Sequence, residues 1–287
     1  MIGTLIRAVA IVVWMLAWWL PGSASALERI PFTDDGGLLR VTGTVDGQPA
    51  PMLVDLGAGL DVLSERLGSR AASVDGKYVT LSLTGQRVDL PIGTVVSIAL
   101  GEFQIDNHIV GIWKGLDGTG VDGLISATAF RSVTATFDYR ARELLIEDAV
   151  TFADRKRFAA RVPLFLQDEL GIALGVFARF DFGNKQSGLC VIDTGLKGVL
   201  IDRRFAAKLG VNLADPSLKN ARTPLGDGVV ATIPELTLSD APDATLARPS
   251  VVFENLVYDC NVGNQFWDGK VFTLDIPRRV MYVAPPA

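Results

Sequence analysis

Short apolar runs that alternate with polar residues recur along most of the chain and are separated by turn-forming residues. Residues 39–45 alternate in this way, Asp46-Gly47 follows as a hairpin turn, and a second apolar run reaches residue 54. Helical patterns are few, at residues 202–209, closed by Gly210, and more weakly at residues 64–72. Further strand-like runs lie at residues 78–83, 95–100, 103–105, 174–180, 189–192, 229–233 and 251–257. The pattern predicts an all-β protein with few short helices.

Two of the predicted strands end in an aspartate that is followed two positions later by a glycine. Residues 52–54 lead into Asp55-Leu56-Gly57, and residues 189–192 lead into Asp193-Thr194-Gly195, 138 positions further on. A carboxylate at the end of a strand, followed by a flexible turn, is exposed at the edge of its sheet. Two such carboxylates brought together can perform acid and base chemistry on a water molecule.

Further similarities at nearly the same spacing indicate two related halves. Residues 62–66 match 199–203 and residues 135–140 match 272–277, both at an offset of 137, and residues 121–125 match 261–265 at an offset of 140. Four matches within three positions of one offset favour duplication over coincidence. We expect two related β-barrel lobes, over residues 27–150 and 151–287, with the charged residues 154–157 at their exposed connection.

Residues 1–26 have the organisation of a secretory signal peptide. Arg7 supplies the positive charge, residues 8–20 form the apolar core, and Ala24-Ser25-Ala26 fits a cleavage site. A membrane anchor is the alternative, but spanning the hydrocarbon needs about 20 apolar residues. We expect an exported protein, periplasmic or secreted, without a stable membrane anchor after cleavage. The remaining chain carries 26 basic and 32 acidic side chains, which argues against nucleic acid and anionic membrane surfaces as partners.

The chain has two cysteines, Cys190 and Cys260. Cys190 lies three positions before Asp193 and Cys260 three before Gly263, so a disulfide would join two core strands of the second lobe. Two buried free thiols are the alternative, because a cysteine also packs as a small apolar side chain. The pattern leaves both open.

Several other chemistries lack their residues. His108 is the only histidine, so a histidine-rich zinc site is excluded, and a lone histidine is more often a surface or satisfied core residue. No serine lies in a Gly-x-Ser-x-Gly motif, and the glycine-rich residues 115–123 lack the lysine of a phosphate-binding loop. We expect no metal and no cofactor.

The two Asp-x-Gly motifs, each followed about seventy residues later by an apolar residue and a glycine, resemble those of the aspartic protease fold. In particular, the chain is similar to the retropepsin-like aspartyl proteases of bacteria, with both lobes fused in one chain. The resemblance implies that Asp55 and Asp193 share one proton and activate a water molecule that hydrolyses a peptide bond. The implied substrate is an extended peptide or unfolded protein, and the implied state is a monomer with pseudo-two-fold lobes.

The resemblance also assigns supporting roles. Gly57 and Gly195 would allow sharp turns beneath the carboxylates, Ala58 fits the family pattern, and the Thr194 hydroxyl would bond to the opposite loop. The turns at Gly85 and Gly226 are the candidate flaps over the substrate, or else ordinary surface hairpins.

Two positions depart from the family pattern. Leu56 stands where threonine or serine is usual, and Leu196-Lys197 replaces small residues. Two alternatives to an aspartic endopeptidase therefore stay open. One is a catalytically weak or inert peptide-binding module on the same fold, and the other is a structural β protein in which both aspartates are architectural.

Overall fold

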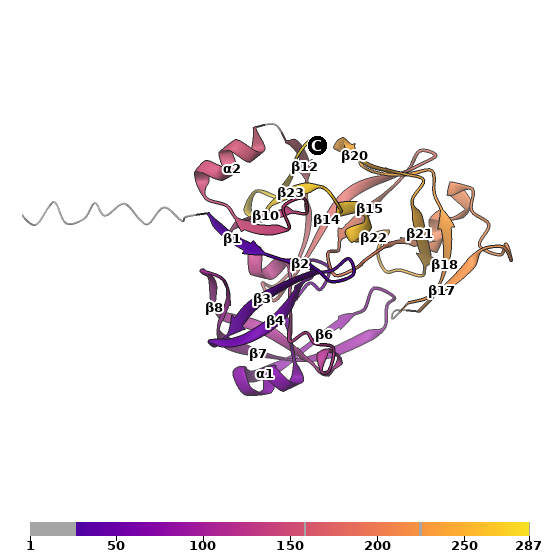
Figure 1. Ribbon diagram of the computed structural model, residues 1–287. Helices are drawn as coiled ribbons and strands as arrows, with labels where there is room; N and C mark the ends of the chain where they lie inside the picture. Colours follow the sequence, from indigo (N-terminus) through magenta and orange to yellow (C-terminus); the bar gives the residue numbers. More distant parts are fainter. Residues whose placement is uncertain (1–26, 158, 224–225, 287) are drawn as a thin grey trace, which may run out of the picture.

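The computed structural model describes residues 27–157, 159–223 and 226–286. These residues form three β-sheets with a few short helices, so the predicted all-β class is confirmed (Figure 1). Residues 1–26, where we predict the signal peptide, lie outside the described residues. Within the described ranges, none of the helices has the length and apolar character needed to cross a membrane.

The first barrel is an eight-stranded sheet whose additional β3–β7 pairing curls it on itself. Its hairpin β3 to β4 turns at Asp46-Gly47, as the sequence predicts. Inward and outward side chains alternate along β3, which buries one face of the strand as the barrel core. In sheet order the strands are β2 (Thr33–Asp34), β3 (Leu39–Val45), β4 (Gln48–Val54), β9 (Gly123–Ile125), β5 (Val62–Ser64), β8 (Phe103–Trp113), β7 (Arg87–Leu100) and β6 (Ser73–Leu81).

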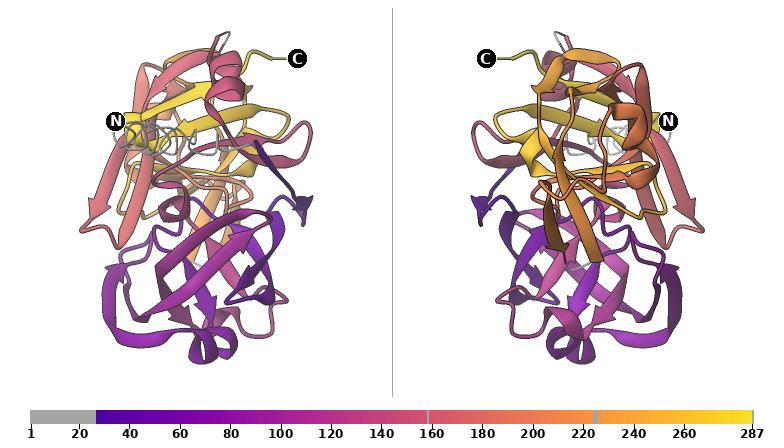
Figure 2. Two further views of the ribbon diagram at one scale, coloured as in Figure 1. Left: turned by 90° about the vertical axis from the view of Figure 1, so that its left-hand side faces the viewer. Right: turned by 90° about the vertical axis from the view of Figure 1, so that its right-hand side faces the viewer.

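The second barrel is a ten-stranded sheet built from the later part of the chain. In sheet order its strands are β17 (Lys219–Thr223), β18 (Gly226–Thr232), β21 (Ser250–Glu254), β16 (Val199–Asp202), β22 (Cys260–Val262), β15 (Gln186–Ile192), β14 (Ala173–Gly183), β19 (Glu235–Leu238) and β20 (Ala241–Ala247), while β13 (Phe165–Glu169) pairs with β14. The two barrels lie one above the other in the side views of Figure 2.

A six-stranded sheet joins the two halves. At its centre, β10 and β23 run antiparallel with Thr136 opposite Thr273, and their hydroxyls are 2.6 Å apart. Phe137 and Phe272 stack beside them with ring centroids 4.8 Å apart. The apolar core is therefore continuous from one barrel to the other. In order, the strands are β1 (Glu28–Pro31), β11 (Glu143–Ile146), β10 (Thr134–Asp138), β23 (Val271–Asp275), β24 (Val280–Val283) and β12 (Ala160–Pro163).

One predicted helix is present, and the other helices differ from the sequence-based expectation in three places. The predicted helix at residues 64–72 is α1 (Glu65–Ala71), which Ser64 caps through the amide of Leu67. The predicted helix at 202–209 is instead two 3₁₀ turns, η3 (Arg203–Phe205) and η4 (Ala207–Leu209), because the amides of Ala206 and Leu209 donate to the carbonyls three residues back and not four. The charged residues expected at the connection belong largely to α2 (Ala149–Lys156), and α3 (Asn264–Trp267) was not predicted. The remaining 3₁₀ turns are η1 (Lys114–Leu116), η2 (Ala127–Phe130) and η5 (Ile276–Arg278).

The strand register corrects one of the internal matches. β4 pairs with β9 so that Val54 faces Ile125, and β15 pairs with β22 so that Ile192 faces Val262. Ile125 and Val262 are therefore equivalent, at an offset of 137 and not 140. The glycine of the second lobe, Gly263, corresponds to Ser126. The sequence match was misplaced because it aligned two glycines that serve different local structures.

Candidate active site

Asp55 and Asp193 occupy equivalent positions directly after β4 and β15. The amide of Asp55 donates to the carbonyl of Ile125 over 2.8 Å, and the amide of Asp193 donates to that of Val262 over 3.0 Å. Each aspartate is thus fixed by the parallel strand beside its own. The strand end places the carboxylate at the edge of the sheet. Asp193 is nevertheless buried there, and not exposed as the sequence analysis expects, because the facing lobe covers it.

The two carboxylates face each other across the junction of the lobes. A Cβ atom built on Gly57 would overlap the carboxylate of Asp193, and one on Gly195 would overlap that of Asp55. Each glycine amide also donates to the carboxylate of its own loop, Gly57 to Asp55 over 3.0 Å and Gly195 to Asp193 over 3.1 Å. Only glycine leaves room for this approach, so both glycines are required by the geometry.

The surroundings disfavour two negative charges. Burial, and then repulsion from Asp193, raise the pKa of Asp55 from its ordinary 3.8 to about 7. Burial also raises the pKa of Asp193, but a hydrogen bond from Asn261 opposes this rise. The Nδ2 atom of buried Asn261 lies 3.0 Å from Asp193 Oδ2. The equivalent residue in the first lobe is Leu124, which has no group to donate to Asp55.

Thr194 joins the two lobes beneath the carboxylates. Its buried hydroxyl accepts a hydrogen bond from the amide of Leu56 over 3.0 Å and donates to the carbonyl of Val54 over 2.8 Å. On the other side, the side chain of Leu56 is fully buried and has no group that could form a matching hydrogen bond. The hydroxyl brace expected from the resemblance is thus formed from one lobe.

Asn264 and Tyr139 form a second brace that the sequence did not reveal. Asn264 Nδ2 donates to the Thr194 carbonyl over 2.7 Å and to that of Gly37, in the first lobe, over 2.5 Å. The Tyr139 hydroxyl in turn donates to Asn264 Oδ1, and burial raises the pKa of this tyrosine well above its usual value. These side chains meet only in the folded chain, so no local pattern signals them.

The equivalent positions Gly263 and Ser126 donate their amides to different kinds of acceptor in the two lobes. In the second lobe the amide of Gly263 donates to the Gly198 carbonyl over 2.9 Å. In the first lobe the amide of Ser126 instead donates to the side chain of Asp61, which is fully buried and also contacts His108. The lone histidine therefore supports the loop that carries Asp55.

The departures at Leu196 and Lys197 leave the backbone contacts of the loop intact. Their carbonyls accept hydrogen bonds from the amides of Asn264, over 2.8 Å, and Gln265, over 2.7 Å. These main-chain bonds do not depend on small side chains. The side chain of Lys197 lies instead beside Gly36 and Gly37 of the first lobe.

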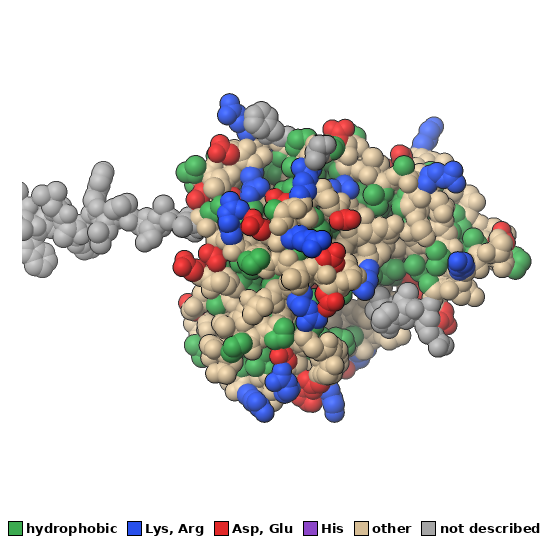
Figure 3. Space-filling model, in the orientation of Figure 1, with side chains coloured by type: hydrophobic (Ala, Val, Ile, Leu, Met, Phe, Trp, Pro, Cys, Tyr) green, Lys and Arg blue, Asp and Glu red, His purple; other side chains and the backbone are tan. Residues whose placement is uncertain are grey.

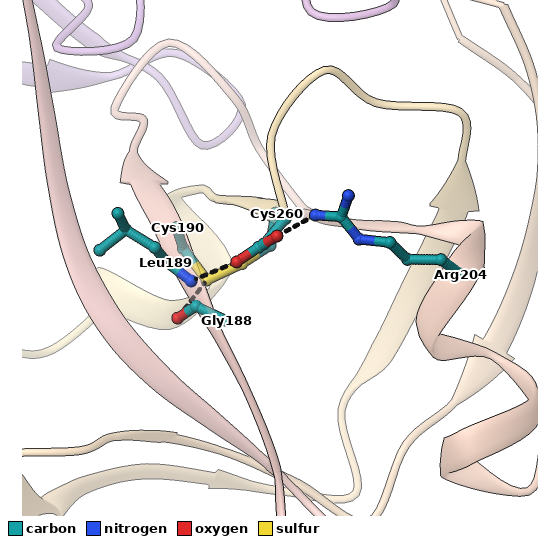
Figure 4. The surroundings of a disulfide bond; sticks show 6 residues. Gly188, Leu189, Cys190, Arg204 and Cys260 are labelled. Atoms are coloured by element: carbon teal, nitrogen blue, oxygen red, sulfur yellow. Dashed lines mark hydrogen bonds and ion pairs between the residues drawn. A yellow bond between two sulfur atoms is a disulfide. The ribbon is translucent and has the colours of Figure 1, made fainter.

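Cys190 and Cys260 form a disulfide between β15 and β22 (Figure 4). The two residues are direct neighbours in this parallel pair, with Cα atoms 4.6 Å apart. Asn261 follows Cys260 immediately, and Asp193 follows the same strand as Cys190. The disulfide therefore holds β15, which positions Asp193, against β22, which carries the side-chain donor Asn261.

A cavity of about 100 Å³ begins at the turn after Asp55 and continues between the lobes. Its walls include Ala58 and the hairpin β6 to β7, which turns at Gly85 with φ at 80°. This hairpin reaches the second lobe, where the amide of Val257 donates to the Leu83 carbonyl over 2.9 Å. Gly226, the other candidate flap position, faces Glu254 and is not in the cavity wall. Both flap assignments stay predictions.

The described residues contain no cluster of histidine, cysteine and acidic side chains suited to a metal ion. Basic and acidic side chains are intermixed on the face drawn in Figure 3.

Comparisons with known proteins agree with the geometry. Residues 41–129 match a family model described as aspartyl protease. No curated protein matches the chain in sequence. Among solved structures, an aspartic proteinase from Irpex lacteus is similar, with a TM-score of 0.58 and 15% identity over 91% of this chain and 98% of that one. Basic 7S globulin from soybean is also similar, with a TM-score of 0.55 and 14% identity over 90% and 94% of the two chains.

The chain therefore has the two-lobed fold of aspartic proteinases, and its first lobe matches the aspartyl protease family. The expected resemblance is confirmed at this level. The narrower similarity to bacterial retropepsin-like proteases stays a prediction.

Proposed function

We propose that the protein is an aspartic endopeptidase in which Asp55 and Asp193 activate a water molecule to hydrolyse peptide bonds. The observation that carries this proposal is the mutual approach of the carboxylates, each lying over the glycine of the opposite loop. Two purely architectural aspartates would gain nothing from this approach, because close like charges disfavour ionisation of both. A shared proton removes the repulsion and prepares the pair for acid and base catalysis.

The surroundings suggest different roles for the two carboxyls. Asn261 donates to Asp193, which favours its ionised form, whereas Asp55 has a pKa raised to about 7 and keeps the proton. Asp193 then takes a proton from the bound water as this attacks the peptide carbonyl. Asp55 donates its proton to the carbonyl oxygen, and the roles reverse as the tetrahedral intermediate breaks down.

The proposed substrate is an extended peptide or an unfolded protein. The cavity beside Asp55 is bounded by strands from both lobes, so the peptide would lie between them. Export to the periplasm or the medium, as the sequence predicts, would bring the protein to such substrates.

An inert peptide-binding module is the second candidate. Leu56 favours it, because the hydroxyl brace is formed from one lobe only. The solved structures are consistent with it too, since one similar chain is titled a globulin and not a proteinase.

The test is cleavage of a chemically unfolded protein between pH 3 and 8 by residues 27–287, with Asp55→Asn and Asp193→Asn as variants. We expect cleavage at acid pH that falls as pH rises through about 7, where Asp55 loses its proton. Each variant should lose at least about 10²-fold in rate, the smallest usual contribution of a general acid or base. Asp240→Asn, at an exposed turn, controls for the charge change. Cleavage unaffected by both dyad variants would exclude the mechanism, and peptide binding without cleavage would favour the module.

A further inference from the structure

The cavity beside Asp55 is lined in part by apolar side chains and in part by polar ones, one of which is charged. Leu60 and Leu90 come from the first lobe and Phe177 comes from the second. Among the described residues that line the cavity, Glu169 alone carries a charge at neutral pH. Because the residues that follow Asp55 form one wall, the cavity would hold a side chain close to the peptide bond that is cleaved.

Glu169 is half-buried and held in place by neutral donors. The hydroxyl of Tyr78, from β6 of the first lobe, donates to Glu169 Oε2, and Gln167 Nε2 donates to Oε1 over 3.0 Å. Tyr258 contributes a hydroxyl 3.4 Å from Gln167 Oε1. Burial and the bond to Glu169 raise the pKa of Tyr78 to about 12, so this tyrosine stays a donor.

Among the residues that the structure describes, none is a basic partner of the Glu169 carboxylate. Other carboxylates are paired with arginines, such as Asp168 with Arg131, but no ion pair in the described part of the chain involves Glu169. A carboxylate that is partly removed from water is stabilised by a cation. The apolar side chains of the lining suit the aliphatic stem of a long basic side chain, and the aromatic ring of Tyr258 lies near the carboxylate's partner Gln167.

We propose that this cavity is a specificity pocket for a lysine or arginine side chain of the peptide, whose charged end pairs with Glu169. The proposal rests on the function proposed above and adds the class of substrate to it. An acidic side chain would be excluded by repulsion, and a short apolar one would leave the carboxylate without a basic partner.

The experiment compares matched peptides that carry lysine, leucine or glutamate at each position around the cleaved bond. At one position, we expect the wild-type protein to prefer lysine over leucine and to reject glutamate. Glu169→Gln should lower the ratio of kcat/KM for lysine to that for leucine about tenfold or more, the factor for one charge-assisted hydrogen bond. Glu169→Lys should turn the preference toward glutamate. Glu235→Gln, at an exposed position of β19, removes the same charge outside the cavity and should leave the ratio unchanged.

Binding separates this proposal from the proposed function. Fluorescence anisotropy of the labelled peptides is measured on Asp193→Asn, with and without Glu169→Gln. Selective binding of the lysine peptide without cleavage by the wild type would support the pocket and refute the endopeptidase. Dyad-dependent cleavage without lysine preference would overturn the pocket alone. If the protein shows no selective binding and no cleavage, both proposals are overturned. If Glu169→Gln does not fold, the preference of the wild type for lysine, leucine or glutamate decides the question.

Discussion

Replacing Asp55 with asparagine should change how the stability of the protein depends on pH. Asparagine keeps the shape of the side chain and an oxygen that can accept from the Gly57 amide. It removes the ionisable group whose pKa burial and Asp193 raise from 3.8 to about 7. The variant therefore isolates the free energy of holding this carboxylate next to its partner.

The sign and size of the effect follow from linkage. An acid whose pKa is higher in the folded state binds more protons there, so its contribution is fully present below about pH 4 and is lost as pH rises through about 7. Each pKa unit corresponds to about 1.36 kcal/mol. Between pH 4 and pH 8 the free energy of unfolding of the wild type should fall by on the order of 4 kcal/mol relative to that of Asp55→Asn.

Urea unfolding at several pH values, with the disulfide intact, measures this difference. The unfolding free energies of the two proteins should be similar near pH 4, and the variant should become progressively more stable above it. Asp240→Asn serves as the charge control. Parallel curves for the wild type and Asp55→Asn between pH 4 and pH 8 would refute the raised pKa and, with it, the shared proton.

Two further predictions concern the neighbours of the dyad. Thr194→Val removes the hydroxyl between the lobes and leaves the Leu56 amide and the Val54 carbonyl unpaired, so urea unfolding should show a loss of about 2–4 kcal/mol, with a clearly smaller loss for Thr194→Ser. Equal losses for valine and serine would exclude the hydroxyl as the cause. Asn261→Leu introduces the residue found at the equivalent position 124 and removes the donor that favours ionised Asp193. The acid limb of the pH profile of kcat/KM should therefore shift to higher pH by about one unit. An unmoved acid limb would show that Asp193 is not the group that must be ionised.

The sequence was sufficient to select Asp55 and Asp193 as a candidate pair because the signals of both residues are local. Asp55 and Asp193 each follow an apolar strand and precede a turn, and Gly57 and Gly195 lie two positions on. Because these features depend on a few consecutive residues, a single offset brings them together. The all-β class followed in the same way from alternation within single strands.

The residues that the sequence did not reveal act through contacts between distant segments. Asn261 reaches Asp193 through the parallel pairing of β22 with β15, and Tyr139 reaches Asn264 across the lobe junction. The misplaced match at residues 121–125 also concealed Asn261. At the offset of 137 it falls opposite Leu124, and the difference between the two lobes becomes visible. Apart from α1, the short helices were missed or misassigned, and a segment as short as α3 has almost no periodicity.

The pairing of Thr136 with Thr273 has a consequence for how such a molecule can be built. These residues lie 137 positions apart, the offset that also relates Ile125 to Val262, so the two lobes meet at structurally equivalent positions. In each half, one edge of the central strand, β10 or β23, is paired only by the strand of the other half. A half-length chain would thus present an open edge at β10 or β23 and would need a second copy of itself to cover it. Holding both lobes in one polypeptide removes any dependence on concentration. It also allows equivalent positions, such as Asn261 and Leu124, to carry different residues while the edge stays closed.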